Sequence, residues 1–511
     1  MTAAGRVFLV GAGPGDPGLL TLKGLAALEQ AHVVVYDHLI GRDLLGLAPE
    51  TAERIYVGKE AGAHSRSQEE INRLLAERAL QGKTVVRLKG GDPFIFGRGG
   101  EEAEYLAARS IPFEVVPGVS SATAVPAYAG IPLTYRGVAS SFVVLTGHED
   151  PTKEGSSTRW AEVARGVDTL VFLMAMTNLQ LIARRLIEHG RSPKDPAALI
   201  RWGTTADQET VVGTLGTIVA DAERARLTPP AILVVGEVVR LRERAAWFEK
   251  KPLFGKRIVV TRTRQQASRF ARLLEEAGAE VLRVPTIRIE PPESWESLDR
   301  ALGEIENFRW VIFTSVNGVE FFRQRLDLAG KDLRSLGSAR VAVIGPETAE
   351  RLRRWGLIPD VIPGEYRAEG LVDLLKGEIR PGDRVLLPRA AEARALLVSE
   401  LERVGARVTE VPVYRTRPVK EEADRLRREL EARRVHMVTF TSSSTARNFA
   451  NLFSQEERGG LLSGVIFASI GPITAETAAQ YGFETRVMPA EYTIPSLARA
   501  IIDYFRKERS A

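Results

Sequence analysis

The chain has 511 residues, of which 44% are hydrophobic and 26% charged, a composition typical of folded globular proteins with several domains. Its formal net charge is only +5 and no long block of one charge sign occurs, so nothing in the sequence favours nucleic-acid binding. It contains no cysteine, which excludes disulfides and thiolate chemistry, and its six scattered histidines have no metal-ligand spacing. We therefore expect small-molecule partners and no metal.

The amino-terminal residues lead almost directly into a predicted strand, without the charged start and apolar stretch of a signal peptide. No apolar run approaches the ~18 residues needed to span a bilayer. From these two observations we expect a cytoplasmic protein that does not bind a membrane.

Short β-branched runs alternate with helical periodicity throughout the chain, which predicts an α/β fold. In the first half, the runs that predict buried strands are RVFLVG from Arg6, HVVVYD from His32, TVVRLKG from Thr84, SFVVLTG from Ser141, DTLVFLMA from Asp168 and AILVVGEVV from Ala231. A basic stretch with Pro252 and Gly255 indicates a domain boundary, which divides the chain into residues 1–250 and 251–511. A second division separates subdomains of about 1–135 and 136–250.

A glycine-rich loop, LVGAGPGDPGLL, follows the first predicted strand. Its glycines have the spacing of a dinucleotide-binding fingerprint, and Asp37 follows about twenty residues further on. A dinucleotide loop presents backbone N–H groups to a pyrophosphate, whereas Pro14 and Pro17 have none. The loop therefore suits a ligand that packs against the main chain without phosphates. A dinucleotide-dependent oxidoreductase is the alternative interpretation.

Two further motifs follow in order, RLKGGDPFIFGRGGEE and VPGVSSATAVPAYAGIPLT. With GAGPGDPGLLTLKG, VVYD and VGK, they resemble the tetrapyrrole methylases, most closely the uroporphyrinogen-III C-methyltransferases, over residues 5–245. The resemblance implies a two-domain methylase fold that binds S-adenosylmethionine as methyl donor and releases S-adenosylhomocysteine. It also implies a homodimer through this half. The cofactor-binding positions that it implies are Pro14, Gly90, Gly91, Asp92, Ile95, Ser120, Ser121, Met174, Gly203 and Ala231.

The same resemblance implies two catalytic residues, Asp37 as proton acceptor and Lys59 of VGK as proton donor. The alternatives are a turn or helix-capping role for Asp37 and a solvated surface charge for Lys59. Met174 would ordinarily be a core residue, and only the resemblance makes it a cofactor contact. Because the implied substrate carries eight carboxylates, we expect basic side chains to bind it through charge-assisted hydrogen bonds. The basic residues in or beside these motifs are Arg87, Lys89, Arg98 and Arg136. The alternative for each of them alone is a surface charge, and we expect the set to contribute to substrate binding.

The second half of the chain repeats itself. Arg262 matches Arg389 and Phe313 matches Phe440 at one common offset, and further matches keep the same order. The repeat predicts two similar α/β domains with a ligand cleft between them.

The motifs FTSVNGVEFF, VIGPETAE, VPVYRTRP, FTSSSTARNF and SIGPITAETA occur in this order after about residue 255, and they resemble those of the uroporphyrinogen-III synthases. The resemblance implies cyclisation of hydroxymethylbilane to uroporphyrinogen III, with loss of water, inversion of ring D and no cofactor. It also implies two parallel-sheet domains joined by a two-strand connection. One domain is expected at about 255–286 plus 416–511 and the other at about 287–415.

In this half, Tyr414 of VPVYRT matches the tyrosine proposed to assist departure of the hydroxyl group. The alternative is a hinge tyrosine whose hydroxyl is satisfied by the protein. The turns TSVN and TSSS can cap a helix, present N–H groups to a substrate carboxylate, or do both. The candidate substrate-binding residues are Arg262, Arg264, Ser315, Asn317, Arg389, Thr441, Ser442, Ser443 and Thr474.

Together the two resemblances predict a bifunctional enzyme of the sirohaem and cobalamin branch. It would make uroporphyrinogen III and methylate it twice to precorrin-2. A methyltransferase fused to a non-catalytic two-domain ligand-binding module is a further alternative.

Overall fold

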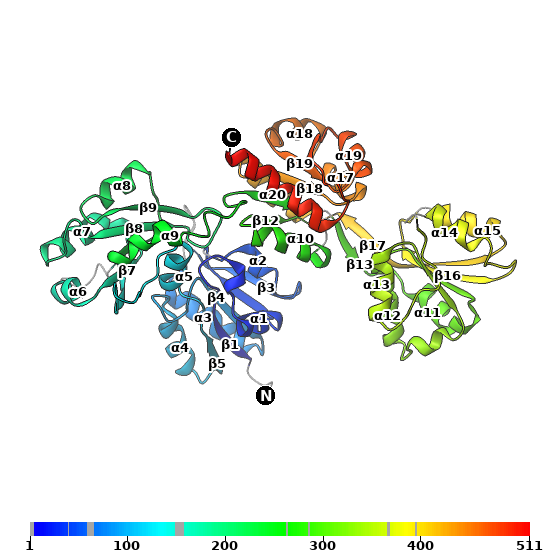
Figure 1. Ribbon diagram of the computed structural model, residues 1–511. Coiled ribbons are helices and arrows are strands. Elements are labelled where there is room, and N and C mark those ends of the chain that lie inside the picture. Colours follow the sequence, from blue (N-terminus) through cyan, green and yellow to red (C-terminus); the bar gives the residue numbers. More distant parts are fainter. Residues whose placement is uncertain are drawn as a thin grey trace. The chain divides into compact units, whose positions relative to one another are not determined.

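The computed structural model describes residues 5–38, 40–58, 66–148, 158–261, 264–284, 287–364, 368–393, 396–418 and 420–510 (Figure 1). The described residues form four five-stranded sheets. The chain divides into two compact units, the first holding most residues up to Ile258 and the second most residues from Val259 to Ala500. In the part of the chain that is described, no helix is long and apolar enough to cross a membrane.

The first sheet is entirely parallel, with the order β3-β2-β4-β1-β5. Its strands are β1 (Arg6–Gly11), β2 (Val33–Tyr36), β3 (Glu53–Tyr56), β4 (Thr84–Lys89) and β5 (Phe113–Val116). Its helices are α1 (Leu22–Glu29), α2 (Arg42–Leu45), α3 (Gln68–Leu80), α4 (Gly99–Ala107) and α5 (Ser121–Tyr128), with a 3-10 turn η1 (Pro17–Leu19). Alternate residues of β1 enter two separate cores, Phe8 and Val10 one and Val7 and Leu9 the other. Burial on both faces explains why these strands are continuous apolar runs.

The second sheet has the order β6-β7-β10-β8-β9 and is mixed, because only β6 and β7 pair in parallel. Its strands are β6 (Phe142–Thr146), β7 (Thr169–Leu173), β8 (Pro196–Arg201), β9 (Glu209–Thr214) and β10 (Ala231–Val235). The helical elements are α6 (Trp160–Gly166), η2 (Met176–Asn178), α7 (Leu179–Glu188), α8 (Ile218–Arg224), η3 (Glu237–Leu241) and α9 (Arg242–Ala245). The strand predicted for the whole run AILVVGEVV is wrong beyond Val235, because Gly236 has a φ of 147° and η3 follows it.

The third sheet has the order β12-β11-β18-β19-β20. Its strands are β11 (Arg257–Val260), β12 (Glu280–Arg283), β18 (Met437–Phe440), β19 (Ile466–Ser469) and β20 (Thr485–Val487). The helices are α10 (Arg264–Glu276), α16 (Lys420–Glu431), α17 (Ser443–Ala450), α18 (Gln455–Leu461), α19 (Pro472–Ala479) and α20 (Ile494–Ser510). A cluster of phenylalanines that includes Phe440, Phe449 and Phe483 fills its core.

The fourth sheet has the order β13-β17-β16-β14-β15. Its strands are β13 (Ile287–Glu290), β14 (Trp310–Phe313), β15 (Arg340–Val343), β16 (Arg384–Ala390) and β17 (Arg407–Pro418). The helical elements are α11 (Glu296–Gly303), η4 (Ile305–Asn307), α12 (Val316–Leu328), η5 (Leu333–Leu336), α13 (Pro346–Arg354), α14 (Ala368–Leu375) and α15 (Leu396–Arg403). The long strand β17 pairs with β16 in parallel and with β13 antiparallel. The antiparallel pair joins Ile287–Glu290 to Arg415–Pro418, next to the domain limits expected at about 286 and 416.

The sequence repeat gives the same local structure twice. Strands β14 and β18 each lead into a helix whose N-cap serine accepts a hydrogen bond from a backbone N–H, Ser315 for α12 and Ser442 for α17. Strands β15 and β19 each lead into a helix with proline in the first turn, where its missing N–H costs nothing.

Candidate functional sites

Three glycine-rich loops of the first sheet meet at contact distance. Gly13 and Gly91 exchange backbone hydrogen bonds of 3.2 and 2.7 Å. A Cβ atom at Gly118 would lie 2.3 Å from the Gly91 carbonyl oxygen and 2.6 Å from the Gly11 Cα atom. Only glycine permits this approach at positions 11 and 118, so the close packing of the loops explains these two glycines.

Asp92 links its own loop to the loop of Gly118 through hydrogen bonds. Its Oδ1 atom accepts a hydrogen bond of 2.8 Å from the Phe94 N–H, and its Oδ2 atom accepts one of 3.0 Å from the Gly118 N–H. The sequence predicts Asp92 as a cofactor contact, and what the structure shows is that its carboxylate holds the loop that precedes Ser120.

A fourth loop, residues 202–205, contacts the opening glycine loop. The Thr204 hydroxyl accepts a hydrogen bond of 3.1 Å from the Asp16 N–H, and the Tyr128 hydroxyl donates one of 2.6 Å to the Asp16 carboxylate. Burial and this hydrogen bond raise the pKa of Tyr128, so its hydroxyl remains a donor. The sequence predicts only Gly203 in this loop. It gives no signal for Thr204 or Tyr128, whose partners are far away along the chain.

Strained backbone is concentrated on the loops that carry the predicted cofactor residues. Phe96, Arg98, Met174, Trp202 and Thr204 have φ values of 51°, 57°, 54°, 44° and 72°. Left-handed conformations are costly for residues other than glycine and tend to occur at functional sites, where the surrounding structure maintains them.

The predicted cofactor residues differ in exposure. Ile95 and Met174 are 43% and 49% exposed, so Met174 is not a core residue. Gly91, Ser120, Gly203 and Ala231 are buried, and Pro14, Gly90, Asp92 and Ser121 are half-buried.

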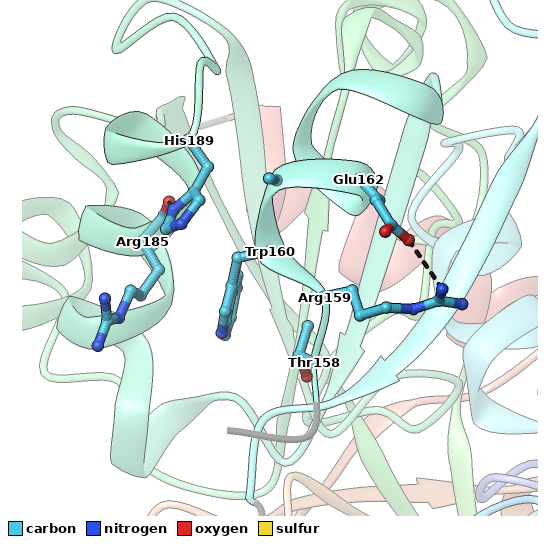
Figure 2. A pocket seen from close by; sticks show the side chains of 7 residues that line it. Thr158, Arg159, Trp160, Glu162, Arg185 and His189 are labelled. Atoms are coloured by element: carbon cyan, nitrogen blue, oxygen red, sulfur yellow. Dashed lines mark hydrogen bonds and ion pairs between the residues drawn. The ribbon is translucent and has the colours of Figure 1, made fainter. Parts of the chain in front are cut away.

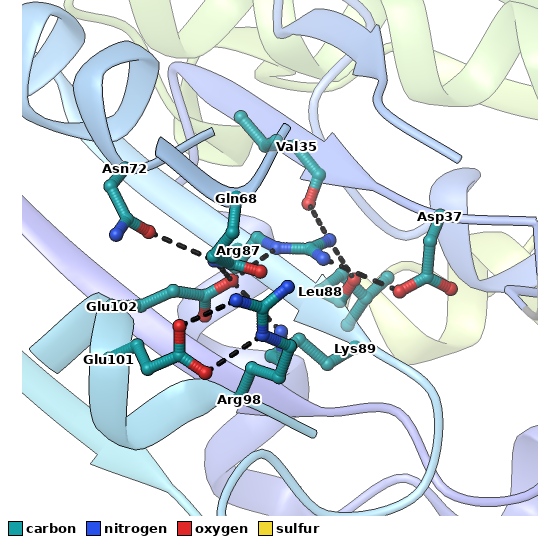
Figure 3. A network of polar contacts seen from close by, with 10 residues as sticks. All are labelled: Val35, Asp37, Gln68, Asn72, Arg87, Leu88, Lys89, Arg98, Glu101 and Glu102. Carbon is teal, nitrogen blue, oxygen red and sulfur yellow. Dashed lines mark hydrogen bonds and ion pairs between the residues drawn. The ribbon is translucent and has the colours of Figure 1, made fainter. Parts of the chain in front are cut away.

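The predicted proton acceptor, Asp37, follows β2 and contacts a buried ionic network (Figure 3). Its side chain is 23% exposed, and its Oδ2 atom lies 3.4 Å from Arg87 Nη2. Arg87 Nε and Lys89 Nζ lie 3.2 and 2.9 Å from the same oxygen of Glu102, which is fully buried. Burial lowers the pKa of Lys89, and the neighbouring charge of Arg87 acts in the same direction.

The remaining basic residues predicted in this half have other environments. Arg98 is exposed and forms two hydrogen bonds with Glu101, of 2.8 and 2.7 Å. Arg136 is exposed. Lys59 lies outside the described residues.

In the fourth sheet, Tyr414 lies next to an irregularity of the β16–β17 pairing, where the register shifts between Arg389 and Ala390. Such bulges redirect side chains and occur often beside active sites. The Tyr414 hydroxyl lies 3.1 Å from Ser315 Oγ, and the Phe321 ring stacks on its ring at 6.0 Å. Burial raises the pKa of Tyr414, so its hydroxyl is a proton donor at neutral pH.

Several other predicted synthase residues have protein partners. Arg389 is 3% exposed and binds Glu410, with Nε and Nη2 distances of 2.7 and 2.6 Å. The Ser443 hydroxyl accepts a hydrogen bond of 2.9 Å from Thr477, and Thr474 is buried. Asn317 and Thr441 are half-buried beside the helix starts. Arg262 and the side chain of Arg264 lie outside the described residues.

Two cavities occur away from the glycine loops. One, of about 330 Å³, is lined by residues that include Arg159, Trp160 and His189 (Figure 2). The other, of about 720 Å³, is lined by residues that include Arg300, Arg415 and Thr416, close in sequence to Tyr414. Neither lining contains a predicted site residue. Within the described ranges, no group of three potential metal ligands occurs.

Comparison with known proteins assigns both halves. The family model of the tetrapyrrole (corrin/porphyrin) methylases matches residues 6–219, and that of the uroporphyrinogen-III synthase HemD matches residues 268–499. The chain is 38% identical over 501 residues to the porphyrin biosynthesis protein HemD of Ruminiclostridium josui, which covers 98% of each chain.

Two further relatives are methyltransferases by name. The chain is 42% identical over 361 residues to the uroporphyrinogen-III C-methyltransferase of Bacillus subtilis strain 168, covering 70% of this chain and 73% of the relative. It is 54% identical over 239 residues to the S-adenosyl-L-methionine-dependent uroporphyrinogen III methyltransferase of Methanosarcina barkeri strain Fusaro, covering 47% of this chain and 94% of the relative.

The folds and these matches define an enzyme in which a uroporphyrinogen-III C-methyltransferase domain is fused to a uroporphyrinogen-III synthase domain. Because one relative matches almost from end to end, the chain belongs to the HemD family of porphyrin biosynthesis proteins. The predicted α/β fold class and the predicted identity of both halves are confirmed. The dinucleotide-dependent alternative receives no support from these matches.

Proposed function

We propose that this chain cyclises hydroxymethylbilane to uroporphyrinogen III and then methylates that product twice to precorrin-2, using S-adenosylmethionine. The observation that carries the proposal is the presence of both matched families on one chain, one after the other. The product of the second half is the substrate of the first, so the two activities are consecutive.

The glycine loops fit a cofactor that packs against the main chain. The absence of side chains at Gly11 and Gly118 lets three backbone segments come together, and the prolines of the opening loop make it a poor phosphate site. S-adenosylmethionine supplies an electrophilic methyl group when bound. The residues that would hold it are the ten predicted cofactor positions, Pro14, Gly90, Gly91, Asp92, Ile95, Ser120, Ser121, Met174, Gly203 and Ala231.

For methyl transfer, we assign Asp37 as the base that takes the proton lost from the methylated tetrapyrrole, and Lys59 as the proton donor. The partly exposed carboxylate at the carboxyl end of a parallel strand supports the assignment of Asp37, because α/β sites lie at that edge. Arg98 and Arg136, both exposed, are the residues we assign to the carboxylates of the substrate.

For ring closure, we propose that Tyr414 donates a hydrogen bond to the departing hydroxyl group. Loss of hydroxide from the benzylic-type carbon leaves a cation that an electron-rich pyrrole attacks, so the protein mainly orients the reactants. The predicted substrate-binding residues at the starts of α12 and α17 are the ones we assign to substrate carboxylates, because backbone N–H groups are available there.

Tyr414→Phe is expected to slow ring closure by no more than about tenfold, because one hydrogen bond is worth about 1 kcal/mol. The measurement is the rate of uroporphyrinogen III formation. Tyr481→Phe, a tyrosine of the third sheet outside the predicted site, is the control and should leave the rate unchanged. An unaltered rate in Tyr414→Phe would remove the hydroxyl from the mechanism.

The synthase assignment is tested by giving the full chain hydroxymethylbilane without S-adenosylmethionine. We expect the type III isomer, because enzymatic closure inverts ring D. A purely type I product, which forms spontaneously, would show that this half is a non-catalytic module.

We propose further that the domains divide at the predicted boundaries, with the methyltransferase at 1–250 and the synthase at 251–511, and that the protein is a cytoplasmic homodimer associating through its methyltransferase half. The resemblance to the methylase family is the support for the dimer. Light scattering of the purified chain measures the mass of the assembly, and a monomer at working concentration would contradict the proposal.

A further inference from the structure

The guanidinium group of Arg87 is committed to the protein at every nitrogen (Figure 3). Its Nε atom donates to Glu102 at 3.2 Å, and its Nη1 atom donates to the carbonyls of Val35 and Leu88 at 3.3 and 3.0 Å. Its Nη2 atom donates to Asp37 at 3.4 Å. The residue is only 4% exposed, so a substrate carboxylate could bind it only after these contacts were broken.

The charges in this network balance only when Asp37 is included. Glu102 is fully buried, and one of its oxygens accepts hydrogen bonds from Arg87, Lys89 and Gln68 while the other has no partner. Two buried cations thus share one buried anion, which leaves one positive charge. Because buried charge is costly unless it is paired, the carboxylate of Asp37 completes the network.

The geometry also fixes the direction of Arg87. The Val35 carbonyl that Arg87 contacts belongs to β2, the strand that ends just before Asp37. Glu102, which is part of α4, binds the opposite side of the guanidinium group. The planar fork of arginine makes such contacts directional. Asp37, by contrast, is partly exposed, and the hydrogen bond from Arg87 restricts the rotamer of its carboxylate.

We infer that Arg87 is a positioning residue that acts through Asp37. Its guanidinium, anchored by Glu102 and the Val35 carbonyl, holds the Asp37 carboxylate in the orientation that proton transfer needs, and it does not bind the substrate. Misplacing a catalytic group by about 1 Å can cost about 10²-fold in rate, so this orientation matters. The inference rests on the proposed role of Asp37 as the base.

A double-mutant cycle on the full chain tests the inference. Arg87→Gln is expected to lower kcat for methylation of uroporphyrinogen III by about 10- to 100-fold. In an Asp37→Asn background the same change should lower kcat by no more than about twofold, because no base remains to be oriented. Equal losses in both backgrounds would overturn the inference, since they would indicate a purely structural role.

The Michaelis constant gives a second, independent readout. If Arg87 acts through Asp37, KM for uroporphyrinogen III stays within about twofold of the wild-type value in Arg87→Gln. A large rise in KM with unchanged kcat would instead make Arg87 a substrate ligand and would overturn the inference.

Arg87→Lys keeps the charge but not the planar fork, and its kcat should lie between those of wild type and Arg87→Gln. If Arg87→Gln fails to fold, as judged by S-adenosylhomocysteine affinity and thermal unfolding, the cycle is made with Arg87→Lys. The Asp37→Asn variant distinguishes failure of the proposed base, Asp37, from failure of the positioning role inferred for Arg87. A normal rate in that variant refutes the base and with it the inference, whereas a slow rate without coupling refutes only the inference.

Discussion

Asp37→Asn is expected to slow methyl transfer by about 10² to 10⁴-fold, the usual contribution of a general base. Asparagine has nearly the same shape, and its carbonyl oxygen can still accept the hydrogen bond from Arg87, but it cannot take up a proton at neutral pH. The glycine loops are therefore expected to persist, although the protein should unfold at a lower temperature because the positive charge that Asp37 balances is left unpaired.

The measurement is single-turnover transfer of labelled methyl groups to uroporphyrinogen III, together with S-adenosylhomocysteine affinity by calorimetry. The affinity should stay close to the wild-type value. Asp43→Asn, on the neighbouring helix α2, makes the same change of charge and should leave methylation unaltered. A normal rate in Asp37→Asn would exclude Asp37 from the chemistry.

The second large effect is expected at the meeting point of the glycine loops. Gly118→Ala would place a Cβ atom 2.3 Å from the Gly91 carbonyl oxygen and 2.6 Å from the Gly11 Cα atom. Both neighbours are backbone atoms, so the loops must move apart to admit it. Because the predicted cofactor residues Gly91 and Ser120 lie on these loops, we expect S-adenosylhomocysteine affinity to fall by more than about 100-fold.

Gly100→Ala is the matched control for this substitution. Gly100 lies in the first turn of α4, and a Cβ atom there would have nothing within 4 Å. Alanine is favoured over glycine in a helix, so this variant should be as stable as the wild type or slightly more stable and should bind S-adenosylhomocysteine normally. Undiminished affinity in Gly118→Ala would show that the loop contact is not needed for cofactor binding.

The local structure could be predicted well where one strand or one turn determines it. The apolar runs that begin near Arg6 and Thr84 are strands β1 and β4, and the serines of TSVN and TSSS cap helices as predicted. These features depend on residues close together in the sequence, where periodicity and capping chemistry are informative.

The roles of Arg87 and Lys89 could not be predicted in the same way. The sequence offers both as candidate ligands of a substrate carboxylate, with a surface charge as the simpler alternative for each, and the structure buries them against Glu102. Arg87 and Lys89 are two residues apart in β4, so their side chains lie on one face of the sheet. This alternation was the signal in the sequence that the two residues share one environment. Whether that face is solvent or the interior depends on the packing of α3 and α4, which local pattern does not reveal.

Contacts between distant segments were also beyond the reach of sequence. Asp16 is held by Tyr128 and Thr204, which lie 112 and 188 positions away. Tyr414 lies next to a register shift of the β16–β17 pairing and contacts Ser315, which is 99 positions away, and side-chain periodicity indicates neither feature.

The most direct test of the central claim is to give the full chain hydroxymethylbilane and methyl-labelled S-adenosylmethionine together and to identify the products by mass and isomer type. We predict a type III product that carries two labelled methyl groups, formed without added enzymes. Recovery of only type I isomers, or of type III uroporphyrinogen without label, would contradict the claim that this chain catalyses both steps.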